Sequence, residues 1–276
     1  MKDESVSSAM PLPKFDQPPV IEVVCGILFH PLDAMLAPHF GQFWERLRAE
    51  GYTSCQEQMP LAPIVELFGE QPSLEIQFSD KPPLPRIWFV RQNDDGIVQL
   101  QRDRFLHNWK KTRPEHAYPN YEKVISLFRQ RLDTFERFLR DGSLGQIQPR
   151  QYEMTYVNHI PQGSGWDAIA DLGHIFPEVS WRNRRDRFLS ALEAVNLRFS
   201  FQLPDGRGRL HATIRSALRR QDNMPVLLLE MNARGMPEDA SRDAMWKWFD
   251  VAHEWIVLGF TDLTSDRMHQ YWKRTQ

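Results

Sequence analysis

Three consecutive segments in the C-terminal half alternate apolar and polar residues, and this alternation is the strongest constraint on the fold. The segments span residues 195–203, 209–218 and 226–234, and the stretch 204–206 (Pro-Asp-Gly) is typical of a hairpin turn. Because side chains along a strand alternate between two faces, these segments predict an antiparallel sheet with one apolar and one polar face. The polar face collects Asn196, Arg198, Ser200, Gln202, His211, Thr213, Arg215, Glu230, Asn232 and Arg234.

The N-terminal half predicts more strands and a long helix. Residues 20–29 are almost all apolar and β-branched, which is typical of a central strand covered on both faces. Apolar residues at helical spacing predict helices over 36–47 and 118–140. Alternation and turn residues predict short strands at 74–78, 86–90 and 96–101.

The C-terminal half repeats this order of elements. A strand over 151–160 precedes a short helix over 166–174, a helical segment over 184–192, the three alternating strands and a long helix over 246–263. The tetrapeptides at 32–35 and 166–169 share Asp-Ala, and each follows a strand with one glutamate, Glu22 or Glu153, which favours a duplication. We therefore predict an α+β fold of two pseudo-repeats, each of strand, helix, antiparallel strands and long helix, with the helices packed on one side of an antiparallel sheet.

The domain boundaries follow from the breaks in this pattern. The proline-containing residues 1–19 predict a flexible leader, and the stretch 142–149 separates two α+β halves. We place these halves at 20–145 and 146–276 and expect them to form one compact unit.

The composition is that of a globular protein. Of 276 residues, 41% are hydrophobic and 25% charged, and the net charge of -2 gives no indication of a polyanionic partner. No apolar run approaches the roughly 20 residues of a membrane helix, and the polar residues 1–8 do not resemble a signal peptide. We therefore expect a cytoplasmic protein that does not enter a membrane, with Cys25 and Cys55 reduced.

Two short clusters of polar and aromatic residues are candidates for a ligand site. One spans residues 103–109 and the other 156–159, and each lies next to a predicted strand. Such residues in apolar surroundings either satisfy structural hydrogen bonds or bind a ligand, and the sequence leaves both interpretations open. Together with the polar sheet face, the candidate ligand-binding residues are Gln99, Gln101, Asp103, His107, Asn108, Trp109, Tyr156, Asn158, His159, Arg215, Glu230 and Asn232.

Catalytic and metal-binding motifs are incomplete. His253-Glu254 begins like the H-E-x-x-H motif of zinc proteases, but Val257 replaces the second histidine. Asp205 with Glu230 and Asn232 resembles a nuclease motif without its lysine, and Asp205 lies in a predicted turn. We therefore identify no catalytic residues and expect neither a metal site nor a cofactor.

One basic run is the candidate for contact with nucleic acid. It contains Arg182, Arg184, Arg185 and Arg187, which could bind phosphates. Asp186 and the apolar residues after the run favour a solvated helix start instead.

Several motifs in one order resemble an uncharacterised, sporadically distributed family of prokaryotic proteins. They are Gln99-Leu-Gln101 with Asp103-Arg-Phe105 and Asn108-Trp109, then Tyr118-Pro-Asn-Tyr121, then Tyr156-Val-Asn-His-Ile160, and the resemblance spans residues 18–263. The family has no established activity. Its patchy distribution is typical of accessory genes, so the resemblance implies a component of a defence or toxin–antitoxin system.

The sequence therefore favours a non-enzymatic binding protein whose polar sheet face contacts another protein. The alternative is a metal-dependent hydrolase acting on nucleic acid or a nucleotide, with Asp103, His107, His159 and Glu230 as its polar groups. Direct binding of nucleic acid through the basic run is a third interpretation, and the oligomeric state stays open.

Overall fold

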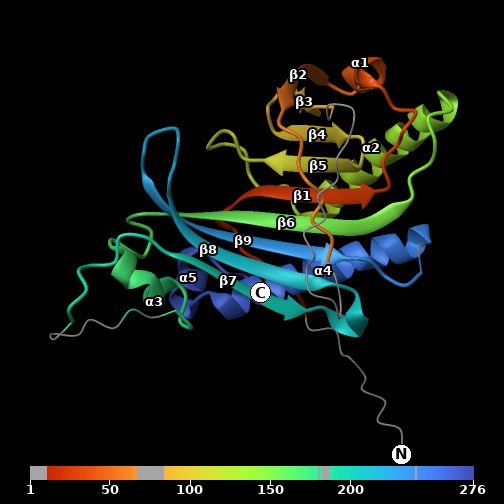
Figure 1. The fold of residues 1–276 in the computed structure, drawn as a ribbon. Coiled ribbons are helices and arrows are strands. Elements are labelled where there is room, and N and C mark those ends of the chain that lie inside the picture. The colour runs from red at the N-terminus through yellow and green to blue at the C-terminus, as the bar shows by residue number, and fades with distance from the viewer. Residues whose placement is uncertain (1–10, 67–83, 180, 182–186, 240) are drawn as a thin grey trace, which may run out of the picture.

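The computed structural model describes residues 11–66, 84–179, 181, 187–239 and 241–276. Within these ranges nine strands form one sheet in the order β2-β3-β4-β5-β1-β6-β9-β8-β7, and all neighbouring pairs are antiparallel (Figure 1). The strands are β1 (Val20–Phe29), β2 (Tyr52–Gln58), β3 (Arg86–Arg91), β4 (Gly96–Gln101), β5 (Arg104–Lys110), β6 (Pro149–Pro161), β7 (Asn196–Gln202), β8 (Arg209–Leu218) and β9 (Pro225–Gly235).

The helices pack on one side of this sheet, which confirms the predicted α+β architecture. α2 lies against β5, and α4 lies against β6 and β9; both are behind the sheet in Figure 1. The helices are α1 (Ala37–Arg48), α2 (Tyr121–Asp141), α3 (Leu172–Ile175), α4 (Arg242–Leu263) and α5 (Asp266–Tyr271), with a 3-10 turn η1 (Ile169–Asp171) before α3.

Aromatic residues at every second strand position build the core between sheet and helices. Phe105 of β5 stacks on Phe135 of α2 with 5.0 Å between ring centroids, and Tyr152 of β6 contacts Trp248 of α4. All four are fully or almost fully buried. Their burial supplies the main driving force for closing the helices over the sheet, and the intervening strand residues therefore point to the other face.

The centre of the sheet is the pair β1 and β6, so the two predicted halves share one continuous sheet. On one side of this pair lie β5, β4, β3 and β2, and on the other lie β9, β8 and β7. Glu22 and Glu153 are both on this central pair, but Glu22 is opposite Val157 and Glu153 is opposite Gly26. The two glutamates are therefore not partners.

Three features of the described residues differ from the sequence predictions. The polar edge strand β2 was not predicted, and the cluster at 103–109 forms most of strand β5. Residues 187–192 of the predicted helical segment are not helical. Phe188 and Leu189 of its apolar stripe are 99% and 62% exposed, and Leu192 packs against the core. The predicted strand at 74–78 lies outside the described residues.

The described part of the predicted leader lies beside the C-terminal segment. Phe15 forms a β-bridge with Arg274, and its ring packs edge-on against Phe260 and Trp272. In the described ranges, no helix combines the length and hydrophobicity required to span a bilayer.

Candidate functional site

The face of the sheet opposite the helices, called the open face below, carries a continuous set of polar side chains. Directly paired residues on neighbouring strands point to the same side of a sheet. Leu28 of β1 is paired with both Arg104 of β5 and Gln151 of β6, which joins the two sides of the sheet. Further along, Asn232 of β9 is paired with His211 of β8, which is paired with Ser200 of β7. The predicted polar face of β7, β8 and β9 is therefore present. Gln99 and Gln101 of β4 lie on the same side of the sheet.

A chain of hydrogen bonds crosses four strands on the first side of this face. Arg86 and Trp88 of β3 both donate to Oε1 of Gln99, at 2.8 and 2.9 Å. The Gln99 amide donates to Asn108 at 2.7 Å, and Asn108 donates to Glu22 at 2.6 Å. Each amide thus uses both its donor and its acceptor, which fixes its orientation. Gln99 and Asn108 have internal partners and hold β3, β4, β5 and β1 in register.

An extended segment, residues 59–66, crosses the open face after β2; we call it the strap. Gln101 is 9% exposed and holds the strap by its main chain. Its Oε1 accepts from the N–H of Leu61 at 2.9 Å, and its Nε2 donates to the carbonyl of the same residue at 3.0 Å. The guanidinium of Arg104 donates to that carbonyl as well, at 3.0 Å. Gln101 therefore binds a main chain as a neighbouring strand would.

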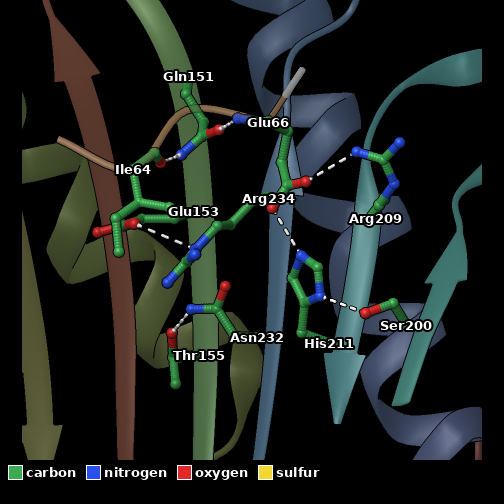
Figure 2. A network of polar contacts seen from close by, with 10 residues as sticks. All are labelled: Ile64, Glu66, Gln151, Glu153, Thr155, Ser200, Arg209, His211, Asn232 and Arg234. Atoms are coloured by element: carbon green, nitrogen blue, oxygen red, sulfur yellow. Dashed lines mark hydrogen bonds and ion pairs between the residues drawn. The ribbon is translucent and has the colours of Figure 1, made fainter. Parts of the chain in front are cut away.

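Gln151 repeats this contact further along the strap. The side chain is 1% exposed, its Nε2 donates to the carbonyl of Ile64 at 2.8 Å, and its Oε1 accepts from the N–H of Glu66 at 2.8 Å. Figure 2 shows Gln151 between these two strap residues. Neither Gln101 nor Gln151 contacts a strap side chain through these bonds, so the recognition does not depend on strap sequence.

Glu66 of the strap forms a charged anchor on the far side of the face. The carboxylate of Glu66 accepts from Arg209 at 2.9 Å and from Nε2 of His211 at 2.6 Å, while Nδ1 of His211 lies 2.8 Å from the Ser200 hydroxyl (Figure 2). Burial raises the pKa of Glu66, but the hydrogen bonds from His211 and Arg209 outweigh it and lower this pKa from 4.5 to about 2. Glu66 is therefore an anion at neutral pH.

Three apolar side chains of the strap are exposed. Met59 is 82% exposed, Leu61 40% and Ile64 60%. Exposed apolar residues in one short segment are typical of a surface that contacts another molecule. The hydrogen bonds that attach the strap to the sheet come from its main chain and from Glu66.

Glu153 and Arg234 occupy the middle of the open face. Their charged groups approach to 4.0 Å, and burial raises the pKa of Glu153 although Arg234 and Arg104 act against this. Beside them, Asn232 donates to the hydroxyl of Thr155, while its Oδ1 is buried without a hydrogen-bond partner in the described part of the chain. A buried polar atom without a partner is costly.

Cations gather where β6 and β8 carry His159 and Arg215. Partial burial and the charges of Arg219, Lys110 and Arg215 lower the pKa of His159 to about 4. Glu230 is paired with Val157 and lies on the same face. His159 is uncharged at neutral pH, and the cations Arg219, Lys110 and Arg215 lie near it.

The remaining candidates lie on the helix side of the sheet or in a turn. Tyr156 lies 2.8 Å from the Tyr118 hydroxyl and 3.1 Å from Nδ1 of His253, which joins β6 to α4. Trp109 packs edge-on against Tyr118, and Asn158 donates to the carbonyl of Leu229 at 3.1 Å. These contacts give Trp109, Tyr156 and Asn158 structural roles. Asp103 lies in the turn between β4 and β5 and pairs with Arg104.

His107 is buried in the core, opposite Cys25. Neither of its ring nitrogens has a hydrogen-bond partner among the described residues. Burial, and secondarily the charge of Arg91, lowers its pKa to about 4, so the ring is neutral at neutral pH. Its pairing with Cys25 puts His107 on the helix side of the sheet, whereas His159 and Glu230 lie on the open face.

The four groups of the hydrolase hypothesis do not form one cluster. His107 points to the helices, His159 and Glu230 lie on the open face, and Asp103 lies in a turn. Among the residues that the structure describes, no three or more His, Cys, Asp or Glu side chains are placed to hold a metal ion. Arg182, Arg184 and Arg185 lie outside the described residues, and the guanidinium of Arg187 lies 3.9 Å from the ring centroid of Trp181.

Sequence reasoning missed Gln151, Glu66 and Arg209 as members of this site. Gln151 has the same strand parity as Glu153, so the period of two places it on the polar face. Glu66 had no such signal, because the strap contains two prolines and no periodic pattern. Its role depends on contacts with residues more than 140 positions away.

Comparisons with known proteins find no match for this chain, whether among protein-family models, curated proteins or solved structures.

Proposed function

We propose that this chain is a non-enzymatic binding protein that holds a partner protein on the open face of its sheet. The observation that supports this most is the pair of buried amides, Gln101 and Gln151, which bind the main chain of an extended segment. Side-chain amides that pair with a peptide main chain recognise polypeptide of any sequence, as an added strand does. Such a surface serves binding and requires no catalytic group.

Charge on the same face adds a preference among partners. The positive groups Lys110, Arg215 and Arg219 around His159 favour an acidic surface on the partner. We further propose that the protein is cytoplasmic. The resemblance to a sporadically distributed prokaryotic family favours an accessory component of a defence or toxin–antitoxin system.

The fold favours an origin by internal duplication. Each half begins with a central strand, β1 or β6, and ends with an antiparallel meander followed by a long helix. The meander has four strands in the first half (β2 to β5) and three in the second (β7 to β9). In both halves the last strand of the meander, β5 or β9, pairs with the central strand. Duplication of one ancestral half would explain why the order of elements matches in both halves. Without duplication, the same order would have to arise twice.

The proposal is tested by capturing the tagged protein from its native host and identifying bound proteins and nucleic acids by mass spectrometry. We expect a stoichiometric protein partner with the wild type. The double variant Arg198→Glu, Arg215→Glu reverses two exposed charges of the open face and is expected to lose most of this partner.

The matched control reverses two exposed charges on the helix side, Lys123→Glu and Arg140→Glu in α2, and is expected to retain the partner. Equal capture by both double variants would show that the open face is not the binding surface. Recovery of nucleic acid without protein, or turnover of a substrate, would contradict the proposal itself.

A further inference from the structure

We infer that the strap occupies a binding site for an extended acidic peptide of the partner, and that this peptide displaces it; the inference rests on the proposed function. The strap itself defines the chemistry of the ligand. Gln101 binds the N–H and the carbonyl of Leu61. Gln151 binds the carbonyl of Ile64, three residues later, and the N–H of Glu66, five residues later. Arg209 and His211 bind the carboxylate of Glu66.

The two glutamines set the conformation of the ligand and leave its sequence free. Both bind only N–H and C=O groups of the strap, which any peptide offers in the extended conformation. Because the glutamine side chains are buried and Gln151 uses both ends of its amide, a shifted or helical peptide would leave amide groups unpaired. The site therefore selects extended chain.

The anchor supplies the specificity. Arg209 and His211 converge on one carboxylate, and Ser200 holds the far nitrogen of the imidazole. The contact of Nδ1 with the Ser200 hydroxyl at 2.8 Å orients the ring so that Nε2 faces the carboxylate at 2.6 Å. Charge-assisted bonds of this kind distinguish glutamate from glutamine, so the ligand needs an acidic side chain at this position.

The attachment of the strap is suited to displacement. Three of its apolar side chains, Met59, Leu61 and Ile64, are 82%, 40% and 60% exposed, so these side chains contribute little burial to the attachment. Segments with few buried apolar contacts open at low cost in free energy. Asn232, the direct partner of His211, also offers a buried Oδ1 that no described residue uses, which an incoming main chain could satisfy.

The test uses a fluorescent peptide with the sequence of residues 59–66, acetylated and amidated at its ends, and measures anisotropy on titration with the full chain. We expect the Glu66→Gln protein, whose own strap lacks its anchor, to bind this peptide at least about tenfold more tightly than the wild type, in which the tethered strap competes. The control Glu57→Gln, an exposed acid of β2, should bind as the wild type does.

Two further arms identify the contacts. In the Glu66→Gln background, Gln101→Ala should weaken peptide binding at least about tenfold, while Gln202→Ala, an exposed glutamine of the same face, should not. A peptide with glutamine in place of its glutamate should lose binding to the same extent. This last arm leaves the protein unchanged, so it stays informative if a buried substitution impairs folding.

The inference is overturned if millimolar peptide does not bind Glu66→Gln, or if the glutamine peptide binds as well as the acidic one. It also fails if a captured partner binds equally in the presence of excess peptide, a result that would leave the proposed function intact. If no partner is captured but the peptide binds saturably, the result would instead contradict the proposed function alone.

Discussion

Gly26 lies where two side chains of the open face close over strand β1. A Cβ atom there would come within 2.1 Å of Leu106 Cδ2 and 3.1 Å of Glu153 Cγ. The absence of a side chain thus allows the central glutamate and its neighbour to pack directly on the main chain. The open face therefore depends on a small residue at Gly26 as well as on polar residues such as Glu153.

We expect Gly26→Ala to lower the free energy of unfolding by about 1–3 kcal/mol, because the added methyl group overpacks this position. The control is Gly41→Ala in α1, where nothing lies within 4 Å of the added Cβ. That change should raise stability by about 0.5–1 kcal/mol, since alanine is the better helix former. Denaturant titration of both variants measures the difference, and equal stabilities would show that Leu106 and Glu153 yield freely.

The faces of individual residues were predictable, and the function of the clusters was not. Asn232 and His211 were assigned to one polar face from the period of two, and their pairing confirms it. The same period divides the cluster at 103–109, because Asn108 points to the open face and His107 to the core. Proximity in sequence suggested one site, but strand geometry separates adjacent side chains.

Among the elements, helix α2 has an unusual start. Asn120 has φ 79° and ψ 166°, and its side chain accepts from the N–H of Lys123 at 3.0 Å. This backbone region is almost restricted to glycine and costs about 1–3 kcal/mol for other residues. The motif Tyr118-Pro-Asn-Tyr121 therefore has a structural explanation: the asparagine caps the helix, and the two tyrosines join it to β6 and α4.

Substitutions of Asn120 should change stability in opposite directions. Asn120→Ala loses the cap and keeps the strain, so the free energy of unfolding should fall by about 1 kcal/mol. Asn120→Gly relieves the strain and loses only a few tenths of a kcal/mol from the cap, so stability should rise. Thermal unfolding followed by circular dichroism distinguishes them, and a loss in both variants would mean that the cap dominates.

Elements with a strong apolar pattern were predicted, and those without one were missed. Residues 242–263 and 121–141 bury a stripe of apolar side chains, so their spacing indicated α4 and α2. β2 and the strap bury almost no side chains, and hydrogen bonds of the main chain hold them in place. Main-chain contacts do not depend on residue type, so the residue pattern did not predict the strap.

Over the whole molecule, buried neutral histidines couple folding to pH. Burial lowers the pKa of both His107 and His253 to about 4. The unfolded chain, with a histidine pKa of about 6.5, then binds more protons than the folded chain between pH 4 and 6.5. Stability is therefore fully present above pH 6.5 and falls as the pH drops toward 4.

For His107 alone this loss amounts to about 2 kcal/mol at pH 5. We expect His107→Leu, which removes the titrating group, to lose about that much less stability than the wild type between pH 7.5 and 5. The exposed His30→Leu is the control and should follow the wild type. Guanidinium unfolding at both pH values measures this, and parallel behaviour of all three proteins would contradict the assigned burial of His107.

The use of main-chain contacts to hold the strap has an evolutionary consequence. Substitutions at Leu61, Ala62 or Ile64 leave the bonds to Gln101 and Gln151 intact, so these positions are free to drift between related proteins. Change at the two glutamines or at Glu66 would instead break the attachment. Diversification should therefore concentrate on the outward side chains of the strap, as in a lineage that adapts to a changing partner on a constant scaffold.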